Sequence, residues 1–387
     1  MMWGPMTQNE ISSHFRIVNG KSQLVGTFTE RYPTSRADFY YVPFIKSMTQ
    51  NLVSIIILTS RWGDQGKILD RCLQGIYRQS FREFEIILVT NGLDQSHVNE
   101  IKNRHPTVRI IENEENKGCA GGRNQGIKEA RGRYIVTLDD DMVPDSKWLE
   151  ELMRFKSRDE GIGMLASKVL FSSSRDIIDC AGVEISKDGN VYGRMGLTID
   201  EGGSEQIEEV FCPSGGAAFY KREVFEDVGL FDEDYFIYYE EVDLAFRARL
   251  AGWRCLYVPR AVVFHHHAWS LGHESSRKIF LLERNKILTI LKDWPIRYIL
   301  YYAPLIVAYD ILADGYYLLK KKDISRFKAK ISALKQLPRV LRERSRIQSN
   351  RRITYAEMDR FWGPYYSPWF IYKRRCRLDR ILQEKSS

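Results

Sequence analysis

The 387-residue sequence lacks several patterns that would place it in common functional classes. Its six cysteines, at positions 72, 119, 180, 212, 255 and 376, include no pair at metal-binding spacing, so neither a zinc site nor a disulfide framework is indicated and a reducing compartment is expected. Residues 1–10 show no basic region followed by an apolar run, so no secretory signal is expected. The glycine-rich stretch at 116–126 fits neither the dinucleotide fingerprint nor the Walker loop.

The charge is distributed unevenly over an otherwise ordinary globular composition of 44% hydrophobic residues. Residues 320–352 carry thirteen Lys and Arg against Asp323 and Glu343, a net charge of +11. Since the whole chain carries +8, the remainder carries −3. The sequence therefore predicts a mildly acidic globule with a strongly basic C-terminal segment.

Apolar stretches with high strand propensity alternate with helical patterns from residue 51 onward. Strands are predicted at 53–58, 84–89, 108–111 and 134–138. Further along, one edge strand is predicted at 177–185, and two short strands are predicted at 255–258 and 261–264. Such alternation is typical of a parallel, doubly wound α/β sheet, whose strand ends meet at one edge. Thr59, Thr90 and Asp139 are expected to line one crevice there. Residues 1–50 are predicted to be an N-terminal extension with one or two strands around 15–28.

The strand at 134–138 ends in three carboxylates, Asp139, Asp140 and Asp141, followed by Pro144. Three like charges repel one another unless a cation lies among them. Because alternate strand residues point the same way, Asp139 and Asp141 can converge on Mg²⁺ or Mn²⁺ while Asp140 points elsewhere. The alternative is an acidic turn that caps a helix over 145–155.

The glycines of the 116–126 stretch have two explanations. At a helix N-terminus they let backbone N–H groups approach a phosphate, which Arg123 and Asn124 in the same turn favour. Alternatively they relieve crowding where a helix packs on the sheet.

Two later motifs also carry ionisable groups. Four aromatic residues within 235–239 precede Glu240, Glu241 and Asp243 at a predicted helix start; these acids either complement the helix dipole or, partly desolvated, act as a general base. The strand at 261–264 ends in three histidines, residues 265–267, which are candidate metal ligands.

These motifs, in this order, resemble family 2 glycosyltransferases of the GT-A fold, especially the rhamnosyltransferase-like branch that builds surface polysaccharides. The resemblance covers roughly residues 51–290 and rests on Val53-Ser-Ile-Ile-Ile, Asn116-x-Gly, Arg123-Asn-x-Gly, Leu138-Asp-x-Asp-x-x-Pro144, Gly215-Gly-Ala, Phe231-Asp-Glu, Tyr239-Glu-Glu-x-Asp-x-x-x-Arg247 and Val263-x-His265. It implies a GT-A domain at 51–290 between the extension at 1–50 and a basic, aromatic, helical region at 291–387.

The resemblance also implies a metal-dependent, inverting transfer from a dTDP-, UDP- or GDP-sugar to a glycan or lipid-linked acceptor. The implied residues are the bases Glu241 or Glu240, the metal ligands Asp139, Asp141 and His265, the donor-binding residues Thr59, Thr90, Asn91, Arg123 and Asp139, and the supporting residues Gly216, Asp243 and Arg247. Two positions depart from the family pattern: Thr90 replaces an Asp that often binds the base, and Glu241 replaces the usual catalytic Asp.

Two other functions compete with this one. A sugar-nucleotide nucleotidyltransferase shares the sheet but usually has a Gly-rich basic loop after the first strand, which residues 59–64 do not provide. A non-catalytic glycan-binding or membrane scaffold protein is the second alternative.

The C-terminal region has a run of twelve uncharged residues, 298–309, which is shorter than the roughly 20 apolar residues that a spanning helix needs and contains Pro304. Its tyrosines and the basic segment that follows suggest peripheral binding to an anionic membrane, on the cytoplasmic face of the cell membrane. The alternative is a pair of packing helices with a solvated basic face. No recognised nucleic-acid motif is present, so no nucleic-acid partner is expected.

Overall fold

A computed structural model describes residues 16–18, 21–23, 49–156, 159–201, 206–267 and 275–383. The chain forms two units, residues 1–39 and 40–387. In the first unit β1 (Arg16–Val18) and β2 (Lys21–Gln23) pair as an antiparallel hairpin, within the range predicted for strands.

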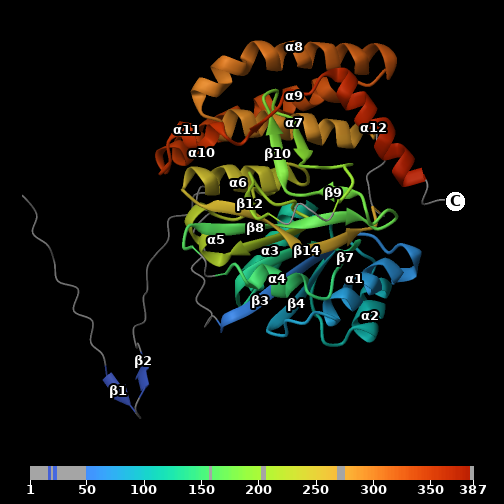
Figure 1. Cartoon of the computed structure of the whole chain (residues 1–387), viewed down its shortest axis with the longest axis vertical. Helices are drawn as coiled ribbons and strands as arrows, with labels where there is room; N and C mark the ends of the chain where they lie inside the picture. Colours follow the sequence, from blue (N-terminus) through green and yellow to red (C-terminus); the bar gives the residue numbers. More distant parts are fainter. Residues whose placement is uncertain are drawn as a thin grey trace, which may run out of the picture. The chain divides into compact units, whose positions relative to one another are not determined.

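The second unit is built on a mixed, mostly parallel sheet with the strand order β12-β14-β8-β13-β6-β3-β4-β5 (Figure 1). The expected α/β architecture is confirmed. The parallel half consists of β3, β4, β5 and β6, and β13 reverses direction between β6 and β8. The strand bounds are β3 (Thr49–Thr59), β4 (Phe84–Asn91), β5 (Arg109–Asn113), β6 (Gly132–Asp139), β8 (Ile162–Phe171), β12 (Glu208–Glu209), β13 (Ala217–Lys221) and β14 (Arg254–His265).

Short strands extend this framework. β7 (Met142–Pro144) pairs with β14, and β9 (Ile178–Cys180) pairs with β8. A separate small sheet joins β10 (Val183–Ser186) to β11 (Val191–Gly193) and to β15 (Trp362–Gly363). The C-terminal region therefore contributes a strand that pairs with the region before residue 290.

Helices cover the sheet and build a further layer beyond it (Figure 1). Those interleaved with the strands are α1 (Lys67–Tyr77), α2 (Gln95–Arg104), α3 (Gly118–Glu129), α4 (Trp148–Met153), α5 (Arg222–Val228) and α6 (Glu240–Leu250). The C-terminal layer contains α7 (Ser276–Asp293), α8 (Ile296–Lys320), α9 (Ser325–Lys335), α10 (Leu337–Ser349), α11 (Tyr355–Asp359) and α12 (Pro368–Gln383). Two 3₁₀ turns occur at Asp64–Gly66 and Glu233–Tyr235.

Two strand predictions were wrong. The single edge strand expected at 177–185 is two strands in different sheets, because the chain turns between them at Gly182, whose φ is +90°. The two short strands expected at 255–264 are one strand, β14, which continues past Pro259 with a register shift between Val258 and Val262.

The apolar run 298–309 was expected to be too short to span a membrane, but it lies inside a longer helix. The helix α8 has 25 residues and continues through Pro304, and among the described helices it alone is long and apolar enough to cross a membrane by length and composition. Its outer stripe is exposed, with Leu300 69% and Leu319 78% accessible. The helix is therefore a long, exposed apolar element on the surface of the unit.

Candidate functional site

Two cavities meet at the acidic end of the parallel strands. The first, here called the Asp140 cavity, has a volume of about 370 Å³; the second, the Glu241 cavity, has a volume of about 480 Å³. Asp139, His265 and His267 line both of them. The strand ends thus place one set of acidic and imidazole groups between two spaces that can each hold a small molecule.

The three carboxylates lie where β6 ends and the chain turns into β7. Because β6 stops at Asp139, strand alternation does not govern the next two residues, and all three line the Asp140 cavity. The carboxyl group of Asp140 also interacts with the buried hydroxyl of Thr59. Burial, together with the neighbouring charges of Asp141 and Asp139, raises the pKa of Asp140 well above its usual value. The cluster therefore favours a cation.

His265 completes this cluster from β14. Its Nε2 lies 3.5 Å from Asp141 Oδ2, and its Nδ1 is 2.7 Å from the carboxylate of Asp179. Burial opposes the charged imidazole, but hydrogen bonds to Asp141 and Asp179 raise the pKa of His265 to about 10. His267 stacks on His265 and lies 3.1 Å from Asp179, whereas His266 faces away and contacts Ser172. Oxygen and imidazole donors in this arrangement fit Mn²⁺ or Mg²⁺.

The buried guanidinium of Arg123 connects the acidic cluster to α6. It is 3% exposed and donates to Asp139 Oδ1 at 2.9 Å and to Glu240 Oε1 at 2.7 Å. Neither Arg123 nor Glu240 is among the residues that line the two cavities, so both lie behind the cavity walls. Their pairing holds the carboxylate of Asp139 in place.

Glu241 lies in the Glu241 cavity next to the same network and is half-buried. Burial and the adjacent charge of Glu240 raise the pKa of Glu241 to about 8. A carboxylate with a pKa near neutrality suits proton abstraction from a hydroxyl group.

Three predicted donor-binding residues are buried below the Asp140 cavity and do not line it. Thr59 and Thr90 are each 1% exposed, and the Thr90 hydroxyl lies 3.4 Å from the Ile111 carbonyl oxygen. The expectation that both threonines line the crevice was wrong, because Ser60 and Arg61 continue beyond β3 and form its wall. Asn91 instead orders the entry to α3 through hydrogen bonds with Asn116 and Gly118.

The glycines of α3 divide between the two explanations. Gly118 has φ +75°, lines the Asp140 cavity and leaves no room for a Cβ, which would lie 2.3 Å from the Phe236 carbonyl oxygen. Gly122 and Gly126 instead pack on the sheet, where a Cβ would meet Leu58 at 2.3 Å or Ile56 at 2.5 Å. The helix N-terminus faces the cavity, and its later glycines serve packing.

Of the three predicted supporting residues, one lies at the site and two stabilise the fold away from the cavities. Gly216 lies against the site: a Cβ there would be 2.6 Å from Asp139 Oδ2. Asp243 is fully buried and pairs with Arg247, which donates to the carbonyl oxygens of residues 228–230. This pair holds the chain where α5 ends and lines neither cavity.

Several cavity residues were not found by sequence reasoning. Arg61 follows the predicted strand end closely enough to have been noticed. Arg277 and Lys278 at the start of α7 line the Asp140 cavity, and Asp179 on β9 lines the Glu241 cavity. These three come from distant parts of the chain, and no local pattern marks them.

Comparison with known proteins gives a consistent family. Residues 54–229 match the family model described as Glycosyl transferase family 2. An uncharacterized protein of Sinorhizobium fredii is 27% identical over 239 residues, 58% of this chain and 25% of that protein. An N-acetylglucosaminyl-diphospho-decaprenol L-rhamnosyltransferase of Mycobacterium tuberculosis is 29% identical over 265 residues, 57% of this chain and 81% of that protein. The chain thus spans a quarter of the first relative and most of the second.

A solved structure has the same fold. The crystal structure of GalNAc-T7 with UDP, GalNAc and Mn²⁺ superposes with a TM-score of 0.51 at 19% sequence identity, over 63% of this chain and 48% of that one. At this identity the similarity concerns the fold.

Proposed function

Because the chain belongs to glycosyltransferase family 2, we propose that it transfers a sugar, with inversion, from a nucleotide-sugar to a hydroxyl group of a lipid-linked glycan. The observation that carries the proposal is the junction of two cavities at Asp139 and His265, with Glu241 in only one of them. One cavity takes the donor and the other the acceptor, so the reacting atoms meet between them.

In this proposal the Asp140 cavity holds the nucleotide diphosphate. Asp139, Asp141 and His265 hold a divalent cation, Mg²⁺ or Mn²⁺, which neutralises charge on the diphosphate when bound. Arg277 and Lys278 line the same cavity and supply fixed positive charge to the phosphates. The N-terminal turn of α3, with Gly118 at the cavity wall, adds a positive dipole end.

Glu241 is the proposed general base. It accepts the proton of the acceptor hydroxyl as the oxygen forms a bond to the anomeric carbon, and the bond from that carbon to the phosphate oxygen breaks with its electron pair leaving on the diphosphate. Glu240 is the weaker candidate because its carboxylate is held by Arg123 and is 3% exposed. Its role is to position Arg123 and, through it, Asp139.

The acceptor is proposed to come from a membrane on which α8 lies flat. The inward face of α8 carries Asp310 and Asp314, which pair with Lys286 of α7 at 2.6 Å and Arg326 of α9 at 3.2 and 2.7 Å. Because both carboxylates pair with cations of the neighbouring helices, the acidic side of α8 faces the protein and its apolar side faces outward. That geometry fits a helix in the membrane plane, on the cytoplasmic face.

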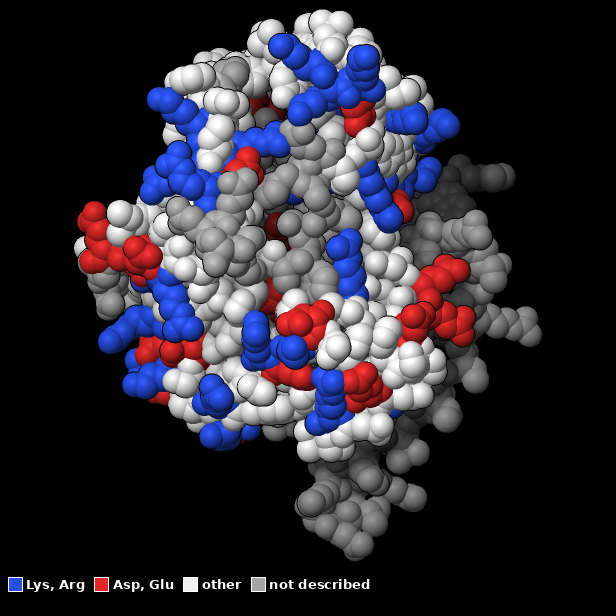
Figure 2. Space-filling view, turned by 90° about the vertical axis from the view of Figure 1, so that its right-hand side faces the viewer, with Lys and Arg blue, Asp and Glu red and all other residues white. Residues whose placement is uncertain are grey.

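Basic side chains lie on the helical part of the molecule that contains α8. Figure 2 shows the side of the molecule where Lys and Arg side chains predominate over the upper, helical part. Basic side chains beside an exposed apolar helix favour anionic head groups. The relative from Mycobacterium tuberculosis is named for a diphospho-decaprenol acceptor, and a rhamnosyl transfer in surface polysaccharide synthesis is the specific reaction that we propose for this chain.

The experiment is a thermal-shift panel of UDP, dTDP, GDP and CMP, each with and without Mn²⁺, on wild type and on Asp139→Ala and Asp141→Ala. We expect one nucleoside diphosphate to raise the melting temperature only with Mn²⁺, and neither variant to respond. A panel in which no nucleotide stabilises the wild type would favour a scaffold protein, and stabilisation that persists in Asp139→Ala and Asp141→Ala would show that these residues do not hold the cation; either result would overturn the proposal.

A further inference from the structure

The C-terminal helix α12 forms one wall of the Glu241 cavity. Its residues Ile371, Arg374, Arg375 and Leu378 line the same 480 Å³ space as Glu241. Cavities of this size hold small organic ligands. Among the described residues that line it, Arg374 and Arg375 are the arginines, and the carboxylates come from Asp139, Asp179 and Glu241. The cavity thus contains Glu241, the proposed base for an acceptor hydroxyl group, and has a wall that carries positive charge.

Arg374 is arranged to receive an anion. Arg374 donates one N–H to the Gly193 carbonyl oxygen at 3.0 Å and lies over the ring of Tyr192 at 5.9 Å, which fixes the guanidinium while leaving further N–H donors. Burial and the positive charge of Arg375 lower the pKa of Lys278, so cations crowd this region.

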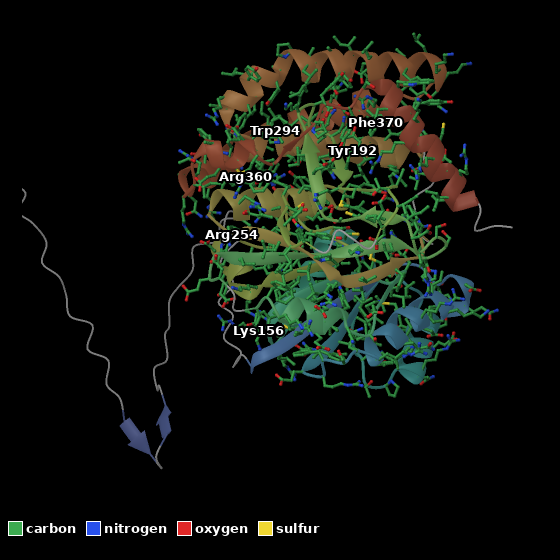
Figure 3. The ribbon with its side chains drawn as sticks, viewed as in Figure 1. Lys156, Tyr192, Arg254, Trp294, Arg360 and Phe370 are labelled. Atoms are coloured by element: carbon green, nitrogen blue, oxygen red, sulfur yellow. The ribbon has the colours of Figure 1, made fainter. Side chains whose placement is uncertain are left out.

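The same helix also begins beside the proposed membrane face. The hydroxyl of Tyr309 on α8 donates to the Tyr366 carbonyl oxygen at 3.1 Å, just before α12. Trp369, Phe370 and Tyr372 on the first turn are 64%, 42% and 58% exposed. Figure 3 shows Phe370 near Tyr192, and Tyr366 contacts both rings. Exposed aromatic residues followed one turn later by arginines suit a lipid–water boundary.

We propose that Arg374 and Arg375 bind the phosphate groups that link the acceptor glycan to its lipid. The lipid then lies along the aromatic start of α12, the phosphates lie against the two guanidinium groups, and the sugar hydroxyl reaches Glu241. The inference rests on the proposed function and specifies its acceptor as a phosphate-linked glycan. Guanidinium groups pair with phosphate through two parallel hydrogen bonds, which gives them an advantage over lysine at such a position.

The test uses the full-length protein and measures binding without turnover. The probes are N-acetylglucosamine joined to farnesol through a diphosphate, the farnesyl glycoside without phosphate, and inorganic pyrophosphate, each titrated calorimetrically. The variant is Arg374→Gln/Arg375→Gln. The matched control is Arg377→Gln/Arg380→Gln, which removes the same charge from exposed positions of α12 outside the cavity. Mn²⁺-dependent donor hydrolysis by each protein is measured separately.

We expect the Arg374→Gln/Arg375→Gln variant to bind the diphosphate probe roughly tenfold or more weakly than wild type, with the control within about twofold. Pyrophosphate binding falls in the same variant but is weaker than lipid-diphosphate binding in wild type, which identifies the lipid-linked source. Equal binding of the glycoside and the diphosphate by wild type, or equal weakening in both double variants, would overturn the inference. Absence of Mn²⁺-dependent donor hydrolysis in wild type would contradict the proposed function itself. Donor hydrolysis that is present in wild type and in Arg377→Gln/Arg380→Gln shows that a failure of the binding test concerns the acceptor site alone.

Discussion

The substitution Gly216→Ala tests how tightly the fold holds Asp139. A methyl group at this position would lie 2.6 Å from Asp139 Oδ2 and 2.6 Å from Met142 Cε. The methionine end can move aside, but the carboxylate is tied to Arg123 by a 2.9 Å hydrogen bond. Since ordinary contacts begin at 3.4 Å, the carboxylate oxygen must shift by roughly 0.8 Å.

A displacement of that size in a ligating group costs up to about 100-fold in rate, and overpacking adds about 1–3 kcal/mol of lost stability. We therefore expect kcat/KM for donor hydrolysis to fall about 10- to 100-fold and Mn²⁺ affinity, measured by electron paramagnetic resonance, to weaken in parallel. Nucleotide affinity without metal changes little.

Gly315→Ala is the matched control, because a Cβ there meets no atom within 4 Å. In the helix α8 it should stabilise the fold by about 1 kcal/mol and leave hydrolysis unchanged. If Gly216→Ala keeps both its Mn²⁺ affinity and its rate within twofold of wild type, Asp139 is not a ligand held in this geometry.

Three further predictions follow from the same network. Glu241→Gln abolishes transfer but keeps Mn²⁺-dependent nucleotide binding; in wild type, transfer rises with pH as Glu241 ionises near its pKa of about 8, and a rate independent of pH between 6 and 9 would reassign the base. Between pH of about 4.5 and 8 the unfolded chain loses the Glu241 proton while the folded chain keeps it, so the folded wild type becomes less stable as the pH rises. Glu241→Gln has no such proton, and its stability relative to wild type therefore increases over this range. A difference in melting temperature that does not change with pH would contradict this. Arg123→Met costs about 3–5 kcal/mol in urea unfolding because Glu240 is left buried and unpaired, and Arg123→Met/Glu240→Gln regains part of it; a loss that is equal in both variants rejects the pairing.

Local patterns predicted the parts of the site that depend on short stretches of chain. The alternation of apolar strands with helices was sufficient for the parallel half of the sheet, and the carboxylates at 139–141 marked its functional edge. The glycines of α3 could not be sorted from sequence, because only the packing shows that Gly118 meets Phe236 while Gly122 meets Leu58.

Residues brought in by tertiary packing escaped prediction. Asp179 reaches the Glu241 cavity from β9, and Lys278 and Arg374 reach the two cavities from helices of the C-terminal layer, so these residues lie on elements far apart in the chain. The continuity of α8 was missed for another reason: Asp310 and Asp314 interrupt its hydropathy, but both are neutralised by cations of the neighbouring helices.

The most direct measurement is the release of nucleoside diphosphate from a panel of UDP-, dTDP- and GDP-sugars by wild type and Asp141→Asn, with Mn²⁺ or with EDTA. A metal-dependent glycosyltransferase releases one nucleoside diphosphate with Mn²⁺, and loses this activity both in EDTA and in the variant. Release of none of the three by wild type, or equal release by Asp141→Asn, would contradict the assignment of the cavity junction as the site of sugar transfer.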